Sequence, residues 1–534
     1  MSDRGTPKRP RDFVVSATLN TLLDETTAAE RDREALVAGD MRMSYRELRA
    51  IVLKCASALR ARGVIAGDRV AILAAPRPES VILFWACVRI GAIFVGFGTR
   101  YREAELRYIV ADADPTLLFG TAAFETDDYR DVLRTVAHAH GTELVVLERW
   151  TGSQGVAPSF ERFLSDAAPT ENYGAVVESS TPAALIYTSG STGHPKGVLL
   201  SHDNILAPFR GMMRVWPLDN PRIIGFMPID HIGSIGSNVV APVAYRGTLV
   251  QRERFSPGDV LETIERERIT LWPSGIPTMI SLVLGHPAFP TTDLSSLELM
   301  WWTGPVTVAR LETLQRRVKK LATGYGMTET SGASTMTATN PSLDILSQSV
   351  GRPADGIHVT IRDDSGSLCA PGTIGEILVR GPSLMLGYWG RPDETARAMT
   401  DNGWLRTGDL GTYRDDGNLQ IVGRAKETIR SGGYNIAPPE VERVLEDHPD
   451  VATAAVVGLP DHLYGEAAHA VVSLHPGTDT GTDLLRAWCR THLSNYKVPK
   501  SISLWPQLPL LPNAKIDKKK ITATLKNLDD RKPH

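Results

Sequence analysis

The sequence predicts an α/β protein with a largely parallel sheet. Helical and strand patterns alternate along the first part of the chain, which is the order that parallel sheets require. The composition, with 42% hydrophobic and 22% charged residues, is that of an ordinary globular protein. At 534 residues the chain is too long for a single hydrophobic core, so we expect more than one domain.

Hydrophobic spacing and turn residues place the first elements. Ser44 is a suitable N-cap for a helix whose apolar residues, from Leu48 to Leu59, recur at helical spacing. A strand, a helix, a second strand and a further helix follow over residues 69–73, about 78–90, 92–95 and from about 103. The most apolar stretch, residues 81–98, contains Arg89 and two glycines, so it fits a buried helix running into a strand better than a membrane span.

Other observations exclude several classes of protein. The net charge of −3 gives no reason to expect nucleic acid as a partner. Residues 1–11 are polar and basic with no apolar segment behind them, which predicts a disordered lead-in and not a signal peptide. The four scattered cysteines favour free thiols, so we expect a cytoplasmic protein without integral membrane contact. Residues 114–181 show a weaker pattern and are interpreted as a surface connection.

One loop carries the strongest chemical signal. An apolar run, residues 183–187, leads into Thr-Ser-Gly-Ser-Thr-Gly-His-Pro-Lys-Gly at residues 188–197. Its glycines, hydroxyls and lysine suit a cradle for phosphate oxygens, although the spacing is not that of a Walker A loop. A plain Gly/Ser/Thr loop is the alternative, but such loops rarely follow a buried strand directly or contain Pro-Lys-Gly.

Further motifs follow this loop in a definite order. They are Met-Pro-Ile-Asp-His-Ile-Gly at 227–233, Leu-Glu-Leu-Met-Trp-Trp-Thr-Gly-Pro at 297–305, Gly-Tyr-Gly-Met-Thr-Glu-Thr at 324–330, Thr-Gly-Asp at 407–409, Gly-Arg-Ala-Lys-Glu at 423–427 and Leu-Pro-Asn-Ala-Lys at 511–515. Singly, a lone histidine in an apolar run or a Thr-Gly-Asp turn is weak evidence of function. Their order together is the stronger signal.

These motifs resemble those of the adenylate-forming superfamily, which includes acyl-CoA synthetases, luciferases and the adenylation domains of peptide synthetases. The resemblance covers about residues 44–520. It implies a large N-terminal domain, residues 1–425, with parallel-sheet α/β layers and a β-barrel-like part. It also implies a small mobile α+β C-terminal domain, residues 426–534.

The resemblance implies an ATP and AMP site. The loop would clamp the β- and γ-phosphates, Tyr325 would stack on the base, and Asp409 would accept hydrogen bonds from both ribose hydroxyls. Arg424 would reach the ribose or phosphate, and Glu329 would supply an oxygen ligand for Mg²⁺. The full set is Thr188, Ser189, Gly190, Ser191, Thr192, Gly193, Lys196, Gly304, Pro305, Tyr325, Gly326, Thr328, Asp409, Arg424 and Lys515.

An acid pocket is implied next to this site. There His231 would gate and orient the substrate and would not act as an acid or base. Strand alternation puts Trp301 and Trp302 on opposite faces, so either one ring fills the core while the other walls the pocket, or both are core. The expected pocket residues are His231, Ser234, Trp302, Thr303 and Gly326.

The C-terminal motifs imply the catalytic lysine and a moving domain. Lys515 matches the family's adenylation lysine, although Ala514 stands where relatives have glycine; a left-handed backbone there would cost Ala about 1 kcal/mol. Lys426 is expected to be the hinge. Arg430, Gly432 and Gly433 are expected to serve the CoA step.

The implied function is an acid–thiol ligase. ATP would convert a carboxylic acid to an acyl-adenylate with release of pyrophosphate, and coenzyme A would then take the acyl group. Lys515, Thr328, Glu329 and His231 are the expected catalytic set. Two alternatives remain: transfer to a carrier protein, an amine or nitrite, and a catalytically silent nucleotide-binding protein. The sequence does not distinguish aliphatic from aryl acids, or a monomer from a homodimer.

Overall fold

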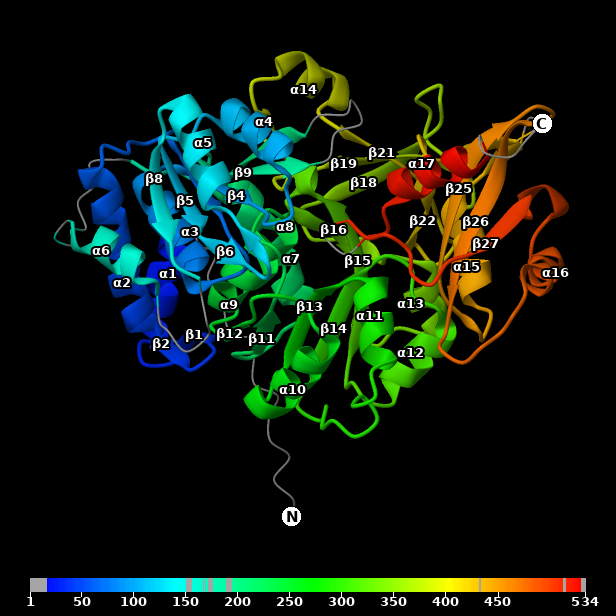
Figure 1. Cartoon of the computed structure of the whole chain (residues 1–534), viewed down its shortest axis with the longest axis horizontal. Coiled ribbons are helices and arrows are strands. Elements are labelled where there is room, and N and C mark those ends of the chain that lie inside the picture. Colours follow the sequence, from blue (N-terminus) through cyan, green and yellow to red (C-terminus); the bar gives the residue numbers. More distant parts are fainter. Residues whose placement is uncertain are drawn as a thin grey trace.

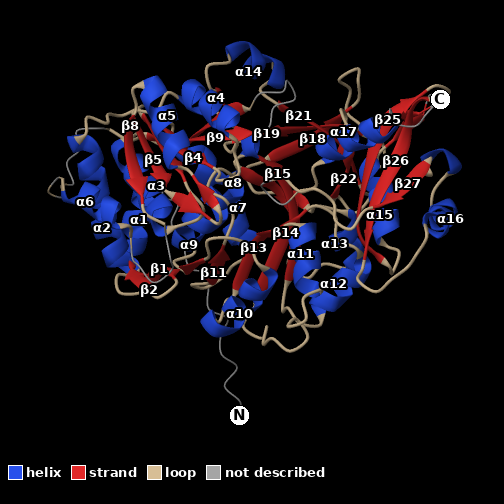
Figure 2. Cartoon of the chain, in the orientation of Figure 1, coloured by secondary structure: helices blue, strands red, loops and turns tan. Residues whose placement is uncertain are grey.

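The structure is a computed structural model, and it describes residues 17–149, 156–166, 168, 170, 176–188, 195–431, 434–511 and 515–529. Two large, mainly parallel sheets form the N-terminal part, with helices packed around them (Figures 1 and 2). A four-stranded antiparallel sheet follows. A separate C-terminal sheet with its own helices lies at one side of the molecule (Figure 1). The predicted α/β fold with a small α+β C-terminal part is confirmed.

The first large sheet has seven strands and is parallel in its middle and at one edge. Its order is β20 (Gly387–Tyr388), β10 (Lys196–Ser201), β9 (Pro182–Thr188), β4 (Ile93–Phe97), β3 (Arg69–Leu73), β5 (Leu117–Thr121) and β8 (Glu143–Leu147). Strands β9, β4, β3, β5 and β8 run parallel, while β10 and β20 are antiparallel at the other edge.

Helices cover both faces of this sheet because its strands are apolar on both sides. Helices α1 (Leu19–Ala29), α2 (Tyr45–Ala61), α3 (Pro78–Ile90) and α6 (Pro158–Ser165) share one apolar cluster. Helices α4 (Glu103–Ala113) and α5 (Arg130–His140) share another. Ser44 caps α2 as predicted, through a capping box with Glu47.

The interpretation of residues 114–181 as a surface connection is wrong for much of its length. Strand β5, the short hairpin of β6 (Ala123–Phe124) and β7 (Asp127–Asp128), helix α5, strand β8 and helix α6 all lie there. Phe119, Phe160 and Phe163 pack edge to face in this region and are buried. These strands are short, so their sequence periodicity is weak; β5 is defined by long-range pairing with β3, and β8 by pairing with β5.

The second large sheet has nine strands. Its order is β17 (Arg352–Pro353), β16 (Gly332–Met336), β15 (Leu321–Met327), β14 (Leu299–Thr303), β13 (Leu271–Gly275), β11 (Arg222–Gly225), β12 (Thr248–Gln251), β1 (Glu34–Ala38) and β2 (Met41–Ser44). One face packs on α10 (Pro257–Glu267), α11 (Pro277–Leu284) and α12 (Val308–Gln315). The other packs on α7 (His202–Val215) and on α8 (Ile232–Ser234), the π-helix η1 (Ile235–Val240) and α9 (Ala241–Ala244).

The four-stranded antiparallel sheet follows in the order β18 (His358–Arg362), β19 (Gly375–Arg380), β21 (Leu405–Tyr413) and β22 (Leu419–Arg424). The hairpin between β21 and β22 turns at Asp416 and Gly417. Two short helices accompany it, α13 (Leu343–Gln348) and α14 (Pro392–Ala398). This sheet is open, with β18 and β22 at its edges, and does not close into the expected barrel.

The C-terminal part has its own core. Its sheet joins β24 (Tyr434–Ile436), β23 (Ile429–Ser431), β26 (Gly465–Leu474) and β25 (Val451–Asp461), and β27 (Ser501–Leu504) pairs with β26. Helices α15 (Pro438–Glu446), α16 (Thr482–His492) and α17 (Lys518–Asp529) pack on it. No helix in the described part of the chain combines the length and apolar character needed to cross a bilayer.

Candidate adenylation site

The phosphate loop closes a hairpin between two strands of the seven-stranded sheet. Thr188 ends β9 and Lys196 begins β10, and the two residues stand opposite each other in the antiparallel register. The strand pairing therefore brings both ends of the loop together. Ser189, Gly190, Ser191, Thr192 and Gly193, also expected in this site, lie outside the described residues.

A second group of site residues meets where the middle of β21 pairs with the end of β22, beside the second half of β15. The Tyr325 hydroxyl donates to Asp409 Oδ2 at 2.6 Å, and Arg424 Nε donates to Asp409 Oδ1 at 3.0 Å. The Asp409 side chain is only 8% exposed, whereas that of Arg424 is 60% exposed. Burial, followed by the neighbouring Asp409 carboxylate, raises the pKa of Tyr325 well above its ordinary value. The tyrosine therefore stays a donor that fixes the aspartate.

Glycine is required at two positions beside this group. A Cβ on Gly326 would lie 1.7 Å from the carbonyl oxygen of Gly332, so only glycine allows the backbones of β15 and β16 to approach so closely. Gly304 has φ +96° and follows the C-terminal end of β14. A side chain there would be strained, and the next residue, Pro305, is exposed.

Glu329 is a buried carboxyl group held by a tyrosine from another segment. Thr328 and Glu329 lie in the short 3-10 helix η2 (Thr328–Thr330), and both are 8% exposed. The Tyr388 hydroxyl donates to Glu329 Oε1 at 2.9 Å. Burial raises the pKa of Glu329, and Asp409 adds to this effect. A nearby cation would stabilise the ionised form.

The described residues contain no group of three or more His, Cys, Asp or Glu side chains placed to hold a metal ion. Magnesium commonly binds one or two carboxylates together with substrate phosphate oxygens and water. Glu329 fits that mode of binding, in which the nucleotide completes the coordination.

His231 opens helix α8 and is neutral. Its Nδ1 accepts a hydrogen bond from Gly233 N at 2.9 Å. Burial, with a smaller contribution from Lys515, lowers the pKa of His231 to about 4. An uncharged imidazole with an occupied Nδ1 suits orientation of a substrate and not proton transfer at neutral pH.

The helix after His231 contains the π-helical turn η1. Ser234, which is 1% exposed, accepts a hydrogen bond from Asn238 Nδ2 at 3.2 Å. The same amide nitrogen lies 3.3 Å from the Met227 carbonyl oxygen, to which it donates. Such turns are common at functional sites because they shift side chains out of α-helical register.

The two tryptophans of β14 do point to opposite faces. Trp301 belongs to the cluster that contains Ile232 and Ile235 and packs on Trp216 with ring centroids 5.4 Å apart. Trp302 is fully buried in the other cluster, among side chains of α10–α12. Trp301, and not Trp302, thus shares a face with the helix that follows His231. Thr303, at the end of β14, is half-buried.

The C-terminal segment brings Lys515 to this site. The Leu511 amide donates to the Lys515 carbonyl at 2.6 Å, and Leu510 and Ile516 form an antiparallel bridge, so backbone pairing on both sides holds the lysine. Figure 1 shows the segment before α17 running from the C-terminal part toward β15 and β16. Ala514 lies outside the described residues.

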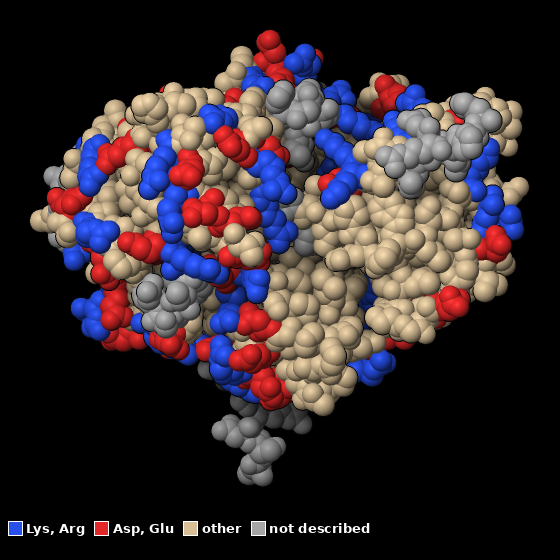
Figure 3. Space-filling view, in the orientation of Figure 1, with Lys and Arg blue, Asp and Glu red and all other residues tan. Residues whose placement is uncertain are grey.

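Electrostatics identify the neighbours of Lys515. Burial, and then Arg424, lowers the pKa of Lys515, while Asp409 and Glu427 act in the opposite direction. Lys515 is nevertheless exposed to solvent, so protein atoms crowd its ammonium group without sealing it off. Lys515 also contributes to the lowered pKa of His231, so it lies within electrostatic range of the histidine as well as of Arg424 and Asp409. Figure 3 shows a furrow between the two parts of the molecule with Lys and Arg side chains on both sides.

The expected hinge and CoA residues lie on the link between the parts. Lys426 is exposed, between the end of β22 at Arg424 and the start of β23 at Ile429. Arg430 is exposed on β23, and its amide donates to Glu466 Oε2 at 2.9 Å. Gly432 and Gly433 lie outside the described residues.

Three relevant residues were not singled out by sequence reasoning. Tyr388 contacts Glu329, Glu394 pairs with Lys196, and Arg310 on α12 contacts the C-terminal part. Tyr388 lies in a Gly-Tyr-Trp segment that could have drawn attention. Glu394 and Arg310 carry no motif, and only the tertiary structure identifies them.

Comparisons with known proteins point to one enzyme family. Residues 23–389 match the AMP-binding enzyme family and residues 440–515 match the AMP-binding enzyme C-terminal domain. A feruloyl-CoA synthase from Amycolatopsis sp. is 35% identical, over 90% of this chain and 93% of the relative. A long-chain-fatty-acid–CoA ligase from Bacillus subtilis (strain 168) is 31% identical, over 94% of both chains.

A solved structure extends the comparison to another reaction. The amide bond synthetase McbA from Marinactinospora thermotolerans is 31% identical and superposes with a TM-score of 0.82, covering 95% of this chain and 99% of that one. The family matches cover most of the chain and include both of its parts. This protein therefore belongs to the AMP-binding, adenylate-forming enzyme family.

Proposed function

We propose that this protein is an acyl-CoA ligase that uses ATP to activate a carboxylic acid and then transfers the acyl group to coenzyme A. The observation that carries the proposal is that Lys515 interacts electrostatically both with the hydrogen-bonded Asp409–Arg424 pair and with His231. One ammonium group thus lies within electrostatic range of the proposed nucleotide site and of the proposed acid site. The CoA ligases among its relatives support the choice of acceptor.

Adenylation gives the acyl group a better leaving group, AMP in place of oxide. A carboxylate is a poor electrophile, and its attack on the α-phosphate of ATP gives an acyl group attached to AMP, with pyrophosphate leaving. Lys515 would stabilise the negative charge that gathers on the reacting oxygens. No general base is needed because the acid is already ionised, which agrees with a neutral His231.

The nucleotide would be held by residues from the two large sheets and from the four-stranded sheet. Asp409, fixed by Tyr325 and Arg424, would accept the ribose hydroxyls. Lys196 would contact the β- and γ-phosphates. Glu329 would help hold Mg²⁺, which supplies charge neutralisation for the leaving pyrophosphate.

The second half-reaction would need a different domain arrangement. Rotation about Lys426 would withdraw Lys515 and present the side of the C-terminal part that carries Arg430, Gly432 and Gly433. The thiol of coenzyme A would then attack the acyl carbonyl, and AMP would leave. The free thiols of the described cysteines fit the cytoplasm as the site of this reaction.

Lys515→Ala tests this division of labour. We expect adenylation, measured as acid-dependent pyrophosphate exchange, to fall by at least about 100-fold, because a charged donor to the transition state is lost. Thioester formation from supplied acyl-AMP and coenzyme A should largely survive. Equal loss of both half-reactions would contradict the assignment of Lys515.

Adenylation with transfer to an amine or another non-CoA acceptor is the second candidate. The amide bond synthetase in the comparison favours it, since that protein covers the same length of chain. A panel of aliphatic and aryl acids with ATP and hydroxylamine trapping, with and without coenzyme A, separates the candidates. Faster AMP release with coenzyme A supports the ligase. No activity with any acid would point to a silent nucleotide-binding protein.

A further inference from the structure

The lysine of the phosphate loop has an ion-pair partner that the proposed reaction does not use. The ammonium group of Lys196 pairs with the carboxylate of Glu394 on α14. Their side chains are 14% and 19% exposed, so the pair is largely shielded from water. The ring of Tyr388 lies on another side of the ammonium group, 5.2 Å from its centroid. Residues from β20 and α14 thus hold the lysine.

Glu394 is itself held in place by a second cation. Arg391 Nη1 lies 3.2 Å from Glu394 Oε1, and Arg391 Nη2 lies 3.2 Å from Asp112 Oδ1 on α4. The Trp389 indole nitrogen donates to the Asp112 carbonyl oxygen at 3.0 Å. These contacts anchor α14 to the seven-stranded sheet side of the molecule. The pKa of Glu394 is lowered, mainly by its hydrogen bond from Lys196, so the carboxylate is ionised.

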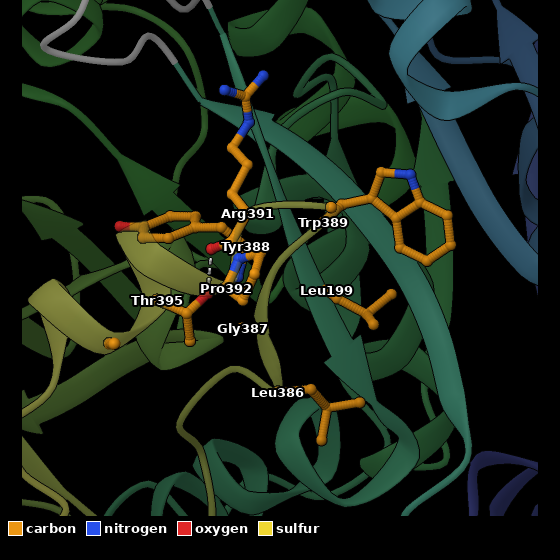
Figure 4. Close-up of a pocket in the computed structure, with 10 residues that line it drawn as sticks. Leu199, Leu386, Gly387, Tyr388, Trp389, Arg391, Pro392 and Thr395 are labelled. Atoms are coloured by element: carbon orange, nitrogen blue, oxygen red, sulfur yellow. Dashed lines mark hydrogen bonds between the residues drawn. The ribbon is translucent and has the colours of Figure 1, made fainter.

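The turn before α14 is also ordered by its own contacts. Figure 4 shows the Tyr388 and Trp389 side chains directed to opposite sides of this turn, with the Tyr388 amide bonded to Thr395. The distance from the Tyr388 amide nitrogen to Thr395 Oγ1 is 2.9 Å. Trp389 points toward α4, and Tyr388 reaches Glu329. The pair between Lys196 and Glu394 is therefore built on a fixed support.

A fixed carboxylate and a phosphate chain compete for the same ammonium group. Lysine offers three donors on one point charge, and a polyphosphate carries more negative charge than one carboxylate. We propose that Glu394 is a positioning residue that competes with the β- and γ-phosphates for Lys196, weakening pyrophosphate binding and promoting its release after adenylation. This inference rests on the function proposed above, in which Lys196 contacts those phosphates.

Direct binding of inorganic pyrophosphate and of AMP tests the inference. With Mg²⁺ at a fixed concentration, calorimetry on the full chain should show that Glu394→Gln binds pyrophosphate roughly 5- to 20-fold more tightly, as expected for a charged hydrogen bond no longer opposed. Affinity for AMP, which lacks β- and γ-phosphates, should stay within about twofold. Asp393→Asn is the matched control, because it removes one negative charge from an exposed neighbouring residue of the same helix.

A double-mutant cycle shows whether the effect passes through Lys196. In a Lys196→Gln background, Glu394→Gln should leave pyrophosphate affinity unchanged, since the group it competes for is gone. Weaker pyrophosphate binding by Glu394→Gln alone would overturn the inference and make Glu394 a support of the site. An equal gain for Asp393→Asn would overturn it too, as an effect of net charge.

These outcomes are separate from a failure of the proposed function. Wild-type protein that binds neither AMP nor pyrophosphate would contradict the proposed nucleotide site itself. Wild-type protein that binds both, with no change in Glu394→Gln, would contradict the role of Glu394 alone.

Discussion

Replacement of Arg310 by methionine should slow adenylation while sparing the thioester step. Arg310, on α12, donates to the Ala452 carbonyl oxygen at 2.6 Å and lies 3.6 Å from Glu446 Oε2 on α15. Both charged side chains are largely buried, at 13% and 15% exposed. This contact joins the two parts of the chain in the arrangement that brings Lys515 to the site. Methionine keeps an unbranched apolar stem but removes the guanidinium group, with its charge and donors.

The size of the loss in adenylation rate depends on the state of Glu446 once Arg310 is replaced. Removing one partner of a buried ion pair costs about 3–5 kcal/mol when the other must stay charged. Burial already raises the pKa of Glu446 to about 7, so this carboxyl can take up a proton, and we expect a smaller cost of about 1.5–2 kcal/mol. At about 1.4 kcal/mol per tenfold change, the arrangement with Lys515 in the site becomes roughly 10- to 30-fold less favoured.

The assay measures the two half-reactions separately. Pyrophosphate exchange should fall by up to this factor, and thioester formation from supplied acyl-AMP should be unchanged or faster. Arg316→Met is the control, because this exposed arginine follows the same helix and bonds only locally, to Thr313 at 3.3 Å. Equal losses in both half-reactions, or unchanged exchange, would refute the reasoning.

Two other predictions concern stability. Because the pKa of Glu446 is raised to about 7, the folded protein keeps a proton that the unfolded chain releases from about pH 4.5 upward. The contribution of this carboxyl group to stability is therefore full below pH 4.5 and is lost as pH rises through about 7. Glu446→Gln should therefore remove on the order of 2–3 kcal/mol from the decrease in unfolding free energy between these two pH values. Urea unfolding at a series of pH values measures this decrease, and an unchanged dependence on pH would contradict the burial argument. Trp302→Ala should lower the unfolding free energy by about 3–5 kcal/mol, because the ring is fully buried. The order of preference among the acids of the panel should stay the same. A changed order of preference, with the unfolding free energy of the wild type, would show that Trp302 lines the acid pocket.

Local patterns were sufficient for the elements whose signals are short-range. The helix from Tyr45, the strand at 69–73 and the helix at 78–90 all form as expected, because capping, turn residues and apolar spacing act within a few residues. The strands within residues 117–147 were missed because they are short and are defined by pairing, of β5 with β3 and of β8 with β5, and by the packing of Phe119 on Phe163. Pairing across long sequence distances leaves little mark on any single window.

The sequence by itself indicated the chemistry of this protein through its resemblance to a known family. The predicted phosphate loop, Tyr325, Glu329, Asp409, Arg424 and Lys515 stand in the order of the adenylate-forming motifs, and such motifs can be read from sequence because they depend on particular residue types. Only the tertiary structure decided which groups restrain them. It pairs Lys196 with Glu394, turns Trp302 into the core, and joins Arg310 to Glu446. These contacts join elements that are far apart in the chain. Their distances are set by folding and cannot be read from any local motif.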